Sequence, residues 1–347
     1  MPKRIVLAST VAVGAVLSAI ICAPGAEAAR NIASCGTLDV AGETYNLTSD
    51  IAADPGNCLV VANNRIRINL QGHSISGSGS GSAITDAGIA RNKTTVVGTP
   101  PAGSPPGTPN GGVFDFKTGI DLWASTRSEI RDVESSGHLA DGIWAGPYSL
   151  IKGCVVKDNA GNGIVVGDFG QVQNCNIGGE SRPAATLVCC DGNGIDGIVG
   201  GQHVLVSQNV ITVNGGTGIT VGEFGTVSSN TASGNGFAGV LAGSHSLITG
   251  NTATDNGDGC VSSCAGASGI ETAGFSTVTS NIASGNAREG IDVEGIKSTV
   301  TGNTANENGD TGIQVECPGT VTNNKSSGNG VVNYELEGTG CFQKSNT

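Results

Sequence analysis

Residues 218–238 read Gly-Ile-Thr-Val-Gly-Glu-Phe-Gly-Thr-Val-Ser-Ser-Asn-Thr-Ala-Ser-Gly-Asn-Gly-Phe-Ala, and they form one complete unit of a repeat. Its first four residues alternate in polarity, which indicates a short β-strand, and Gly-Glu-Phe-Gly is typical of a turn. Thr-Val-Ser-Ser and Thr-Ala-Ser give two further short strands, and Gly-Asn-Gly turns the chain back. Three strands and three turns form one triangular coil, which can bury its apolar face only against neighbouring coils.

The same pattern recurs along the chain and is indexed here by an anchor glycine that precedes Ile or Val. Steps between anchors are mostly 21 or 22 residues, with one step of 23 and two of 34 and 30. Strict hexapeptides, which a left-handed β-helix would show, are missing. We therefore predict an all-β chain, a single-stranded right-handed parallel β-helix of ten or more coils stacked about 4.8 Å apart. The anchors are Gly119, Gly142, Gly163, Gly197, Gly218, Gly239, Gly269, Gly290 and Gly312.

Three further series of residues keep fixed positions relative to the anchors. Asn recurs nine and four residues before most anchors, where an inward amide can bond to the Asn above and below it. His138 takes one of these positions, and we expect it to make the same hydrogen bond. A third series, six residues after the anchor, is expected to stack at one corner. Its members are Tyr148, Phe169, His203, Phe224, His245 and Phe275.

The chain divides into a leader and two structural parts. Residues 1–28 have a basic start, an apolar run and an Ala-x-Ala cleavage signature, as in a secretory signal peptide. We expect a secreted, periplasmic or cell-surface protein with no membrane span after cleavage; a retained anchor or a lipoprotein signal is the alternative. Residues 29–111 are expected to form an N-terminal cap and first coils with a Pro/Gly-rich loop at 100–109. Residues 112–347 hold the regular repeats.

The net charge limits the classes of binding partner, and the cysteine content indicates the cellular compartment. The net charge is −12 and no basic run occurs, so nucleic acid is not an expected partner and unaided binding of a polyanion is disfavoured. Ten of the 11 cysteines remain after signal cleavage, which favours disulfides in an exported protein. Cys189 and Cys190 either form a strained adjacent pair or bond to another partner. The expected pairs are Cys35–Cys58, Cys154–Cys175, Cys260–Cys264 and Cys317–Cys341.

Two N-terminal runs add a family resemblance to the repeat. They are Gly56–Val61 (Gly-Asn-Cys-Leu-Val-Val) and Ile68–Gly77 (Ile-Asn-Leu-Gln-Gly-His-Ser-Ile-Ser-Gly). Together with the coils, they resemble the right-handed β-helix superfamily that includes pectate lyases and NosD-like periplasmic proteins. This resemblance implies function on the anchor-strand face, beside insertions around 180–191 and 257–266. The Arg or Lys base of the lyases and the signatures of polygalacturonases and alginate epimerases are missing from the matching positions.

The outward positions of the anchor strands carry the candidate chemistry. Trp123 and Trp144 lie at one end, and with Tyr148 they are candidates for stacking on sugar rings. Stacked carboxylates at the other end repel, so they need a cation, a partner or a raised pKa. The carboxylates are Glu271, Asp292, Glu294, Glu316, Glu335 and Glu337.

Three interpretations of this acidic end stay open. It is a solvated edge that prevents association of rods, a Ca²⁺ site made by Asp292, Glu294 and Glu316, or a catalytic set. In the catalytic interpretation Glu271 and Asp292 act as acid and base, and Arg288 orients or neutralises them.

Two hypotheses about function follow. The first is a carbohydrate-active β-helix that binds a polysaccharide or cell-surface glycan and cleaves or remodels it, as a polysaccharide lyase or a glycoside hydrolase if it is an enzyme. The alternative is a non-catalytic surface or structural protein for adhesion or envelope organisation, which the missing signatures favour.

Overall fold

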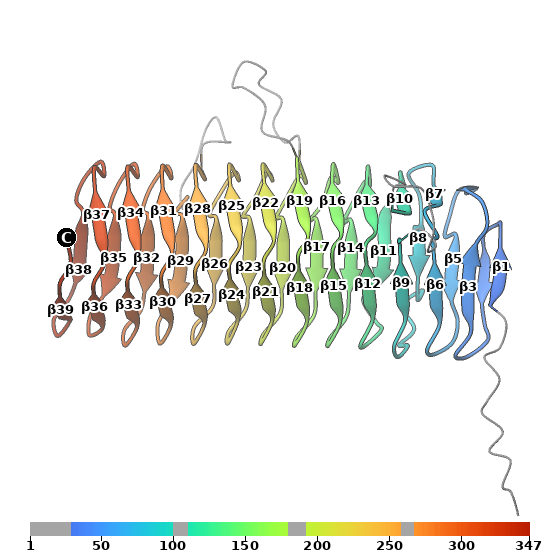
Figure 1. Cartoon of the computed structure of the whole chain (residues 1–347), viewed down its shortest axis with the longest axis horizontal. Coiled ribbons are helices and arrows are strands. Elements are labelled where there is room, and N and C mark those ends of the chain that lie inside the picture. The colour runs from blue at the N-terminus through green and yellow to red at the C-terminus, as the bar shows by residue number, and fades with distance from the viewer. Residues whose placement is uncertain (1–28, 100–109, 180–191, 258–266) are drawn as a thin grey trace, which may run out of the picture.

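The computed structural model describes residues 29–99, 110–179, 192–257 and 267–347. In these residues every regular element is a strand, and the strands form three parallel sheets along one rod (Figure 1). Each regular coil gives one strand to each sheet, so the right-handed parallel β-helix is confirmed. No helix in the described ranges is long and apolar enough to cross a membrane. The predicted features outside these ranges are the signal peptide 1–28, the loop 100–109, the insertion residues 180–191 and 258–266, and Cys189, Cys190, Cys260 and Cys264.

The sheet whose strands follow the anchor glycines is called the anchor sheet here. It has 13 strands in sequential order, each paired in parallel with the next. The strands are β2 (Gly36–Leu38), β5 (Leu59–Val61), β8 (Ser82–Thr85), β11 (Thr118–Leu122), β14 (Ile143–Ala145), β17 (Ile164–Val166), β20 (Ile198–Gly200), β23 (Ile219–Val221), β26 (Val240–Ala242), β29 (Ile270–Ala273), β32 (Ile291–Glu294), β35 (Ile313–Glu316) and β38 (Tyr334–Glu337).

The second sheet holds β1 and the strand that follows each anchor strand, and it has 14 members. They are β1 (Arg30–Ile32), β3 (Thr44–Leu47), β6 (Arg67–Asn69), β9 (Thr95–Val97), β12 (Glu129–Arg131), β15 (Leu150–Lys152), β18 (Gln171–Gln173), β21 (Leu205–Ser207), β24 (Thr226–Ser228), β27 (Leu247–Thr249), β30 (Thr277–Thr279), β33 (Thr299–Thr301), β36 (Thr320–Thr322) and β39 (Phe342–Lys344).

The third sheet closes the triangle with 12 strands. They are β4 (Ile51–Ala52), β7 (Ser74–Ser76), β10 (Gly112–Phe114), β13 (Glu134–Ser136), β16 (Val155–Lys157), β19 (Asn176–Gly178), β22 (Val210–Thr212), β25 (Thr231–Ser233), β28 (Thr252–Thr254), β31 (Ile282–Ser284), β34 (Thr304–Asn306) and β37 (Lys325–Ser327).

Strand alternation explains both the core and the outward face. In β23, Ile219 and Val221 are 0% and 3% exposed and face the core, while Thr220 between them faces out. The anchor must be glycine because the next coil lies very close. A Cβ on Gly218 would lie 2.7 Å from the carbonyl oxygen of Gly239 and 2.8 Å from Asn235 Nδ2.

The predicted asparagine ladders are present and buried. Asn230 Oδ1 accepts from the backbone N and Nδ2 of Asn209 at 2.9 and 3.0 Å, and Asn230 Nδ2 donates to Asn251 Oδ1 at 3.0 Å. His138 makes the expected replacement bond, since its Nδ1 accepts from the backbone N–H of Phe116 at 3.1 Å. Burial lowers the pKa of His138 to about 4, so this ring is neutral at physiological pH.

Two of the predicted disulfides form and a third does not. Cys35–Cys58 and Cys317–Cys341 are bonded, with Cα atoms 4.5 and 5.1 Å apart. The predicted Cys154–Cys175 bond is wrong, because both side chains are buried free thiols. Cys175 Sγ accepts from the backbone N–H of Cys154 at 3.4 Å, which is the bond that an Asn of the ladder would make. Coil spacing brings such sulfurs near each other, but here this contact occupies the Cys175 sulfur.

Candidate functional site

The acidic end of the anchor sheet places two carboxylic acids in register on neighbouring strands. Glu271 of β29 is the Cα partner of Asp292 of β32, and Ala273 is the partner of Glu294. Strand alternation turns Glu271 and Asp292 away from the core, on the same face. Because parallel strands lie about 4.8 Å apart, the two carboxyl groups are close neighbours.

Asp292 has an environment suited to proton transfer. Its Oδ1 is buried and has no hydrogen-bond partner among the residues that the structure describes. Burial, and then the charges of Glu289, Glu294 and Glu271, raise the pKa of Asp292 to about 7, while Arg288 opposes the shift. Burial also raises the pKa of Glu271, with Glu294 and Glu289 as further causes. The pair therefore provides an acid that changes protonation state near neutral pH.

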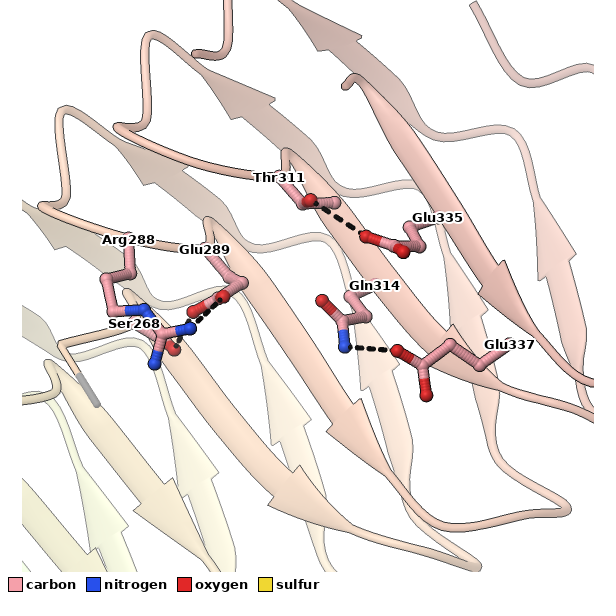
Figure 2. Close-up of polar contacts among 7 residues, drawn as sticks. All are labelled: Ser268, Arg288, Glu289, Thr311, Gln314, Glu335 and Glu337. Atoms are coloured by element: carbon pink, nitrogen blue, oxygen red, sulfur yellow. Dashed lines mark hydrogen bonds and ion pairs between the residues drawn. The ribbon is translucent and has the colours of Figure 1, made fainter. Parts of the chain in front are cut away.

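Glu289 is a member of this site that the sequence analysis did not single out. Figure 2 shows Arg288 and Ser268 converging on it: Arg288 Nη2 donates to Oε1 at 3.0 Å, and Ser268 Oγ donates to Oε2 at 3.0 Å. Glu289 is only 5% exposed. Arg288 was expected to pair with Glu271 or Asp292, but its direct partner is Glu289. The sequence did contain a signal for Glu289, because a polar residue often stands directly before the anchor glycine. Asp196 is another example, and its Oδ1 accepts from the backbone N–H of Thr217 at 2.7 Å.

A surface depression of about 300 Å³ continues the acidic face toward the C-terminus. Two carboxylates of this face already have partners, since Thr311 donates to Glu335 at 3.2 Å and Gln314 donates to Glu337 at 2.9 Å (Figure 2). No group of three or more acidic, His or Cys residues in the described ranges is arranged to hold a metal ion. The predicted Ca²⁺ site stays a prediction. The depression is lined by Asp292, Val293, Glu294, Gln314, Glu316 and Glu337.

The predicted tryptophans lie together but far from the acids. Trp123 and Trp144 are 49% and 40% exposed, their ring centroids lie 6.1 Å apart, and their planes are inclined by 35°. Seven strand steps separate β11 from β32, which is roughly 34 Å along the rod. The structure thus forms two separate clusters on one face.

Tyr148 belongs to a third place, the corner after the anchor strands, where the predicted ring stack is present. Its ring lies parallel to Phe169 at a centroid distance of 5.0 Å, and the guanidinium of Arg127 covers it at 5.4 Å. Lys297 caps the far end of the stack, 5.3 Å from the centroid of Phe275. Both faces of the Tyr148 ring are therefore occupied, which leaves its edge, but no free face, for a sugar. The stacked rings are Tyr148, Phe169, His203, Phe224, His245 and Phe275.

Several solved structures are similar to this chain. The A-module of mannuronan C-5 epimerase AlgE4 from Azotobacter vinelandii is 15% identical, with a TM-score of 0.50 over 89% of this chain and 90% of that one. A double mutant of the periplasmic alginate epimerase AlgG is 13% identical, with a TM-score of 0.48 over 88% and 77%. The catalytic unit of a GH87 α-1,3-glucanase from Streptomyces thermodiastaticus is 14% identical, with a TM-score of 0.45 over 88% and 63%.

At these identities the similarity concerns the fold alone. None of the curated proteins compared with the chain matches it. The family described as "Right handed beta helix region" matches residues 44–195 and 193–347, which together cover most of the chain. The chain therefore belongs to the right-handed β-helix family.

Proposed function

We propose that this chain is an exported glycoside hydrolase that acts on an uncharged polysaccharide bound along the anchor sheet. The observation that carries the proposal is the Glu271–Asp292 pair, in which one acid has a raised pKa of about 7 beside a second carboxyl on the neighbouring strand. Two disulfides in the described residues support export, because such bonds persist in oxidising compartments. The epimerase module that shares the fold acts on mannuronan by its name, which makes a polysaccharide a reasonable ligand class.

The two carboxyl groups would divide the reaction between them. Protonated Asp292 would donate its proton to the glycosidic oxygen while ionised Glu271 attacks the anomeric carbon, so that the glycosidic bond breaks and the protonated leaving sugar departs. Water, deprotonated by the Asp292 carboxylate, would then cleave the glycosyl ester on Glu271 and restore both groups. Hydrolases that retain configuration place their carboxyl groups about 5–5.5 Å apart, close to one strand spacing of about 4.8 Å. Retention of anomeric configuration is therefore the expected outcome.

The charge of the site favours hydrolysis over β-elimination. A lyase acts on a uronic acid, whose carboxylate must be neutralised, and the neighbours of Asp292 are themselves acidic. Arg288, the nearby cation, is already bound to Glu289 at 3.0 Å. An uncharged chain avoids this repulsion.

The test is release of reducing ends from neutral glucans, xylans and mannans. Glu271→Gln and Asp292→Asn should each reduce the rate by at least about 100-fold, since each removes a proton-transfer or nucleophilic group. Glu307→Gln, an exposed change after β34 and away from the anchor sheet, is the matched control and should keep the activity. If the parent releases no reducing ends, the non-catalytic surface protein becomes the better hypothesis, and if the parent and Glu271→Gln proteins release them equally, Glu271 is not catalytic. Unsaturated products would instead indicate a lyase.

A further inference from the structure

The tryptophan pair lies beside an aspartate that occupies the same repeat position as Asp292. Asp121 of β11 is the Cα partner of Trp144 of β14, and Trp123 lies two residues after Asp121, in the turn that follows β11. As in Asp292, the Oδ1 of Asp121 is buried without a hydrogen-bond partner among the described residues. A buried acceptor without a donor is costly, so an external hydroxyl group would be a favourable partner once the carboxyl turns toward it.

The neighbouring acids give no hydrogen bond to the Oδ1 of Asp121. Asp86 is 1% exposed and uses its own oxygens internally, accepting from Ser125 Oγ at 2.7 Å and from Gly88 N at 2.9 Å. Asp141 Oδ1 is likewise occupied, since it accepts from the backbone N–H of Asn162 at 2.7 Å. Burial and then Asp86 raise the pKa of Asp121. An anionic ligand would be repelled here, whereas an uncharged hydroxyl would not.

The indole rings supply the complementary apolar surface. Within the described ranges, neither ring has a ring or cation contact besides the 6.1 Å contact between the two. A pyranose presents C–H groups on its face and hydroxyl groups at its rim, so it can stack on an indole and bond to an adjacent carboxyl group. An unspecific apolar partner would make no use of Asp121.

The surface between the tryptophans and the acids is uncharged at the outward row. Its side chains belong to the four intervening strands β17, β20, β23 and β26, and they are partly buried. A linear chain laid along the rod would thus meet no fixed charge in this row over the five strand steps from β14 to β29, roughly 24 Å. The residues of this row are Val165, Val199, Thr220 and Leu241.

We propose that Trp123, Trp144 and Asp121 form a distal sugar-binding subsite, and that the ligand is a linear, uncharged glycan long enough to reach from this subsite to Glu271 and Asp292. This inference rests on the proposed function for the reaction itself, whereas binding at the tryptophans is independent of it. Short oligosaccharides would occupy one cluster only. Long chains would engage both and gain affinity from the second contact.

Intrinsic fluorescence tests the subsite directly, because Trp123 and Trp144 are the two tryptophans of the chain. Titration with cello-, xylo- and manno-oligosaccharides of increasing length should change the emission and show tighter binding once the oligosaccharide spans both clusters. In a calorimetric titration with the longest binding oligosaccharide, Trp144→Ala and Asp121→Asn should each weaken binding about five- to tenfold. Phe237→Ala, which removes an exposed aromatic ring from a turn, is the control and should bind like the parent.

The experiments distinguish the proposed hydrolase activity from the proposed sugar-binding subsite. If Glu271→Gln loses activity but keeps the fluorescence change with long oligosaccharides, both proposals stand. If reducing ends are never released but Trp144→Ala still weakens binding, the subsite stands and the hydrolase does not. If Trp144→Ala and Asp121→Asn bind every oligosaccharide like the parent, or if no oligosaccharide changes the emission, the subsite is refuted.

Discussion

Replacing Asp292 by Asn should stabilise the protein at pH 8 and change it little at pH 4. Burial and the charges of Glu289, Glu294 and Glu271 raise the pKa of Asp292 from 3.8 to about 7. The native state therefore binds more protons than the unfolded state between these values, and parent stability falls as pH rises from about 4 through 7. A neutral Asn side chain removes this loss. Glu271, whose pKa is also raised, should keep a smaller part of the slope.

The size of the effect follows from the same shift. A full conversion would give an upper limit of about 4 kcal/mol at pH 8, because one pKa unit corresponds to about 1.4 kcal/mol. Asp292 is only partly buried, and solvent screens its charged neighbours, so a gain of about 1–2 kcal/mol is expected.

Urea unfolding of the parent and variant at pH 4, 6 and 8, followed by circular dichroism, measures this gain. A rod of stacked coils need not unfold in two states, so transition midpoints should be compared first. Asp39→Asn, an exposed change in the N-terminal coils, is the control and should leave the pH profile unchanged. If Asp292→Asn is no more stable than the parent at pH 8, Asp292 ionises like a surface carboxyl group and cannot serve as the proposed acid.

Three further predictions concern the ladder, the thiols and the cation. Asn251→Ala should lower the free energy of unfolding by about 3 kcal/mol or more, because it leaves buried donors of the preceding Asn unpaired; a small change in the urea midpoint would contradict this. After unfolding without reductant, the parent should show two more reactive thiols than a Cys154→Ala/Cys175→Ala variant, and an equal count would mean that the two are bonded. We propose that Ca²⁺ binds weakly at the acidic depression. With a dissociation constant of about 1 mM, 10 mM Ca²⁺ would stabilise the parent by about 1.4 kcal/mol. The Glu294→Gln/Glu316→Gln variant would not gain this stability. Equal melting temperatures of the parent with and without Ca²⁺ would refute the site.

The fold was predictable because the same pattern of strand, turn and ladder residues recurs in coil after coil. The anchor glycine, the two Asn positions and the outward parity of the strands all follow from one coil, and Glu271 and Asp292 were placed on the right face by alternation alone. Glu289 was not predicted as a site residue because it lies on a turn, where strand alternation does not determine the direction of a side chain. Its burial and its bonds to Arg288 and Ser268 depend on the close packing of the turns.

Cysteine pairing was only partly predictable for a related reason. Cys154 and Cys175 are one coil apart, like the two bonded pairs, and so spacing cannot separate the cases. What differs is the surroundings of the sulfur. Cys175 Sγ accepts a backbone hydrogen bond, and its backbone N–H donates to the first Asn of the ladder, Asn209, at 2.9 Å. The two thiols thus extend the ladder by hydrogen bonding.

In a protein built of repeated coils, functional residues are expected where a position departs from its repeat. A position that is filled alike in every coil is explained by stacking, as with the anchor glycines. A position that departs from its series needs another cause. The outward row is uncharged along the middle of the anchor sheet and changes to Asp121 with Trp144 at one end and to Glu271 with Asp292 at the other. Both aspartates keep an unpaired buried oxygen, which stacking alone does not require and which a ligand hydroxyl group or a transferred proton would satisfy.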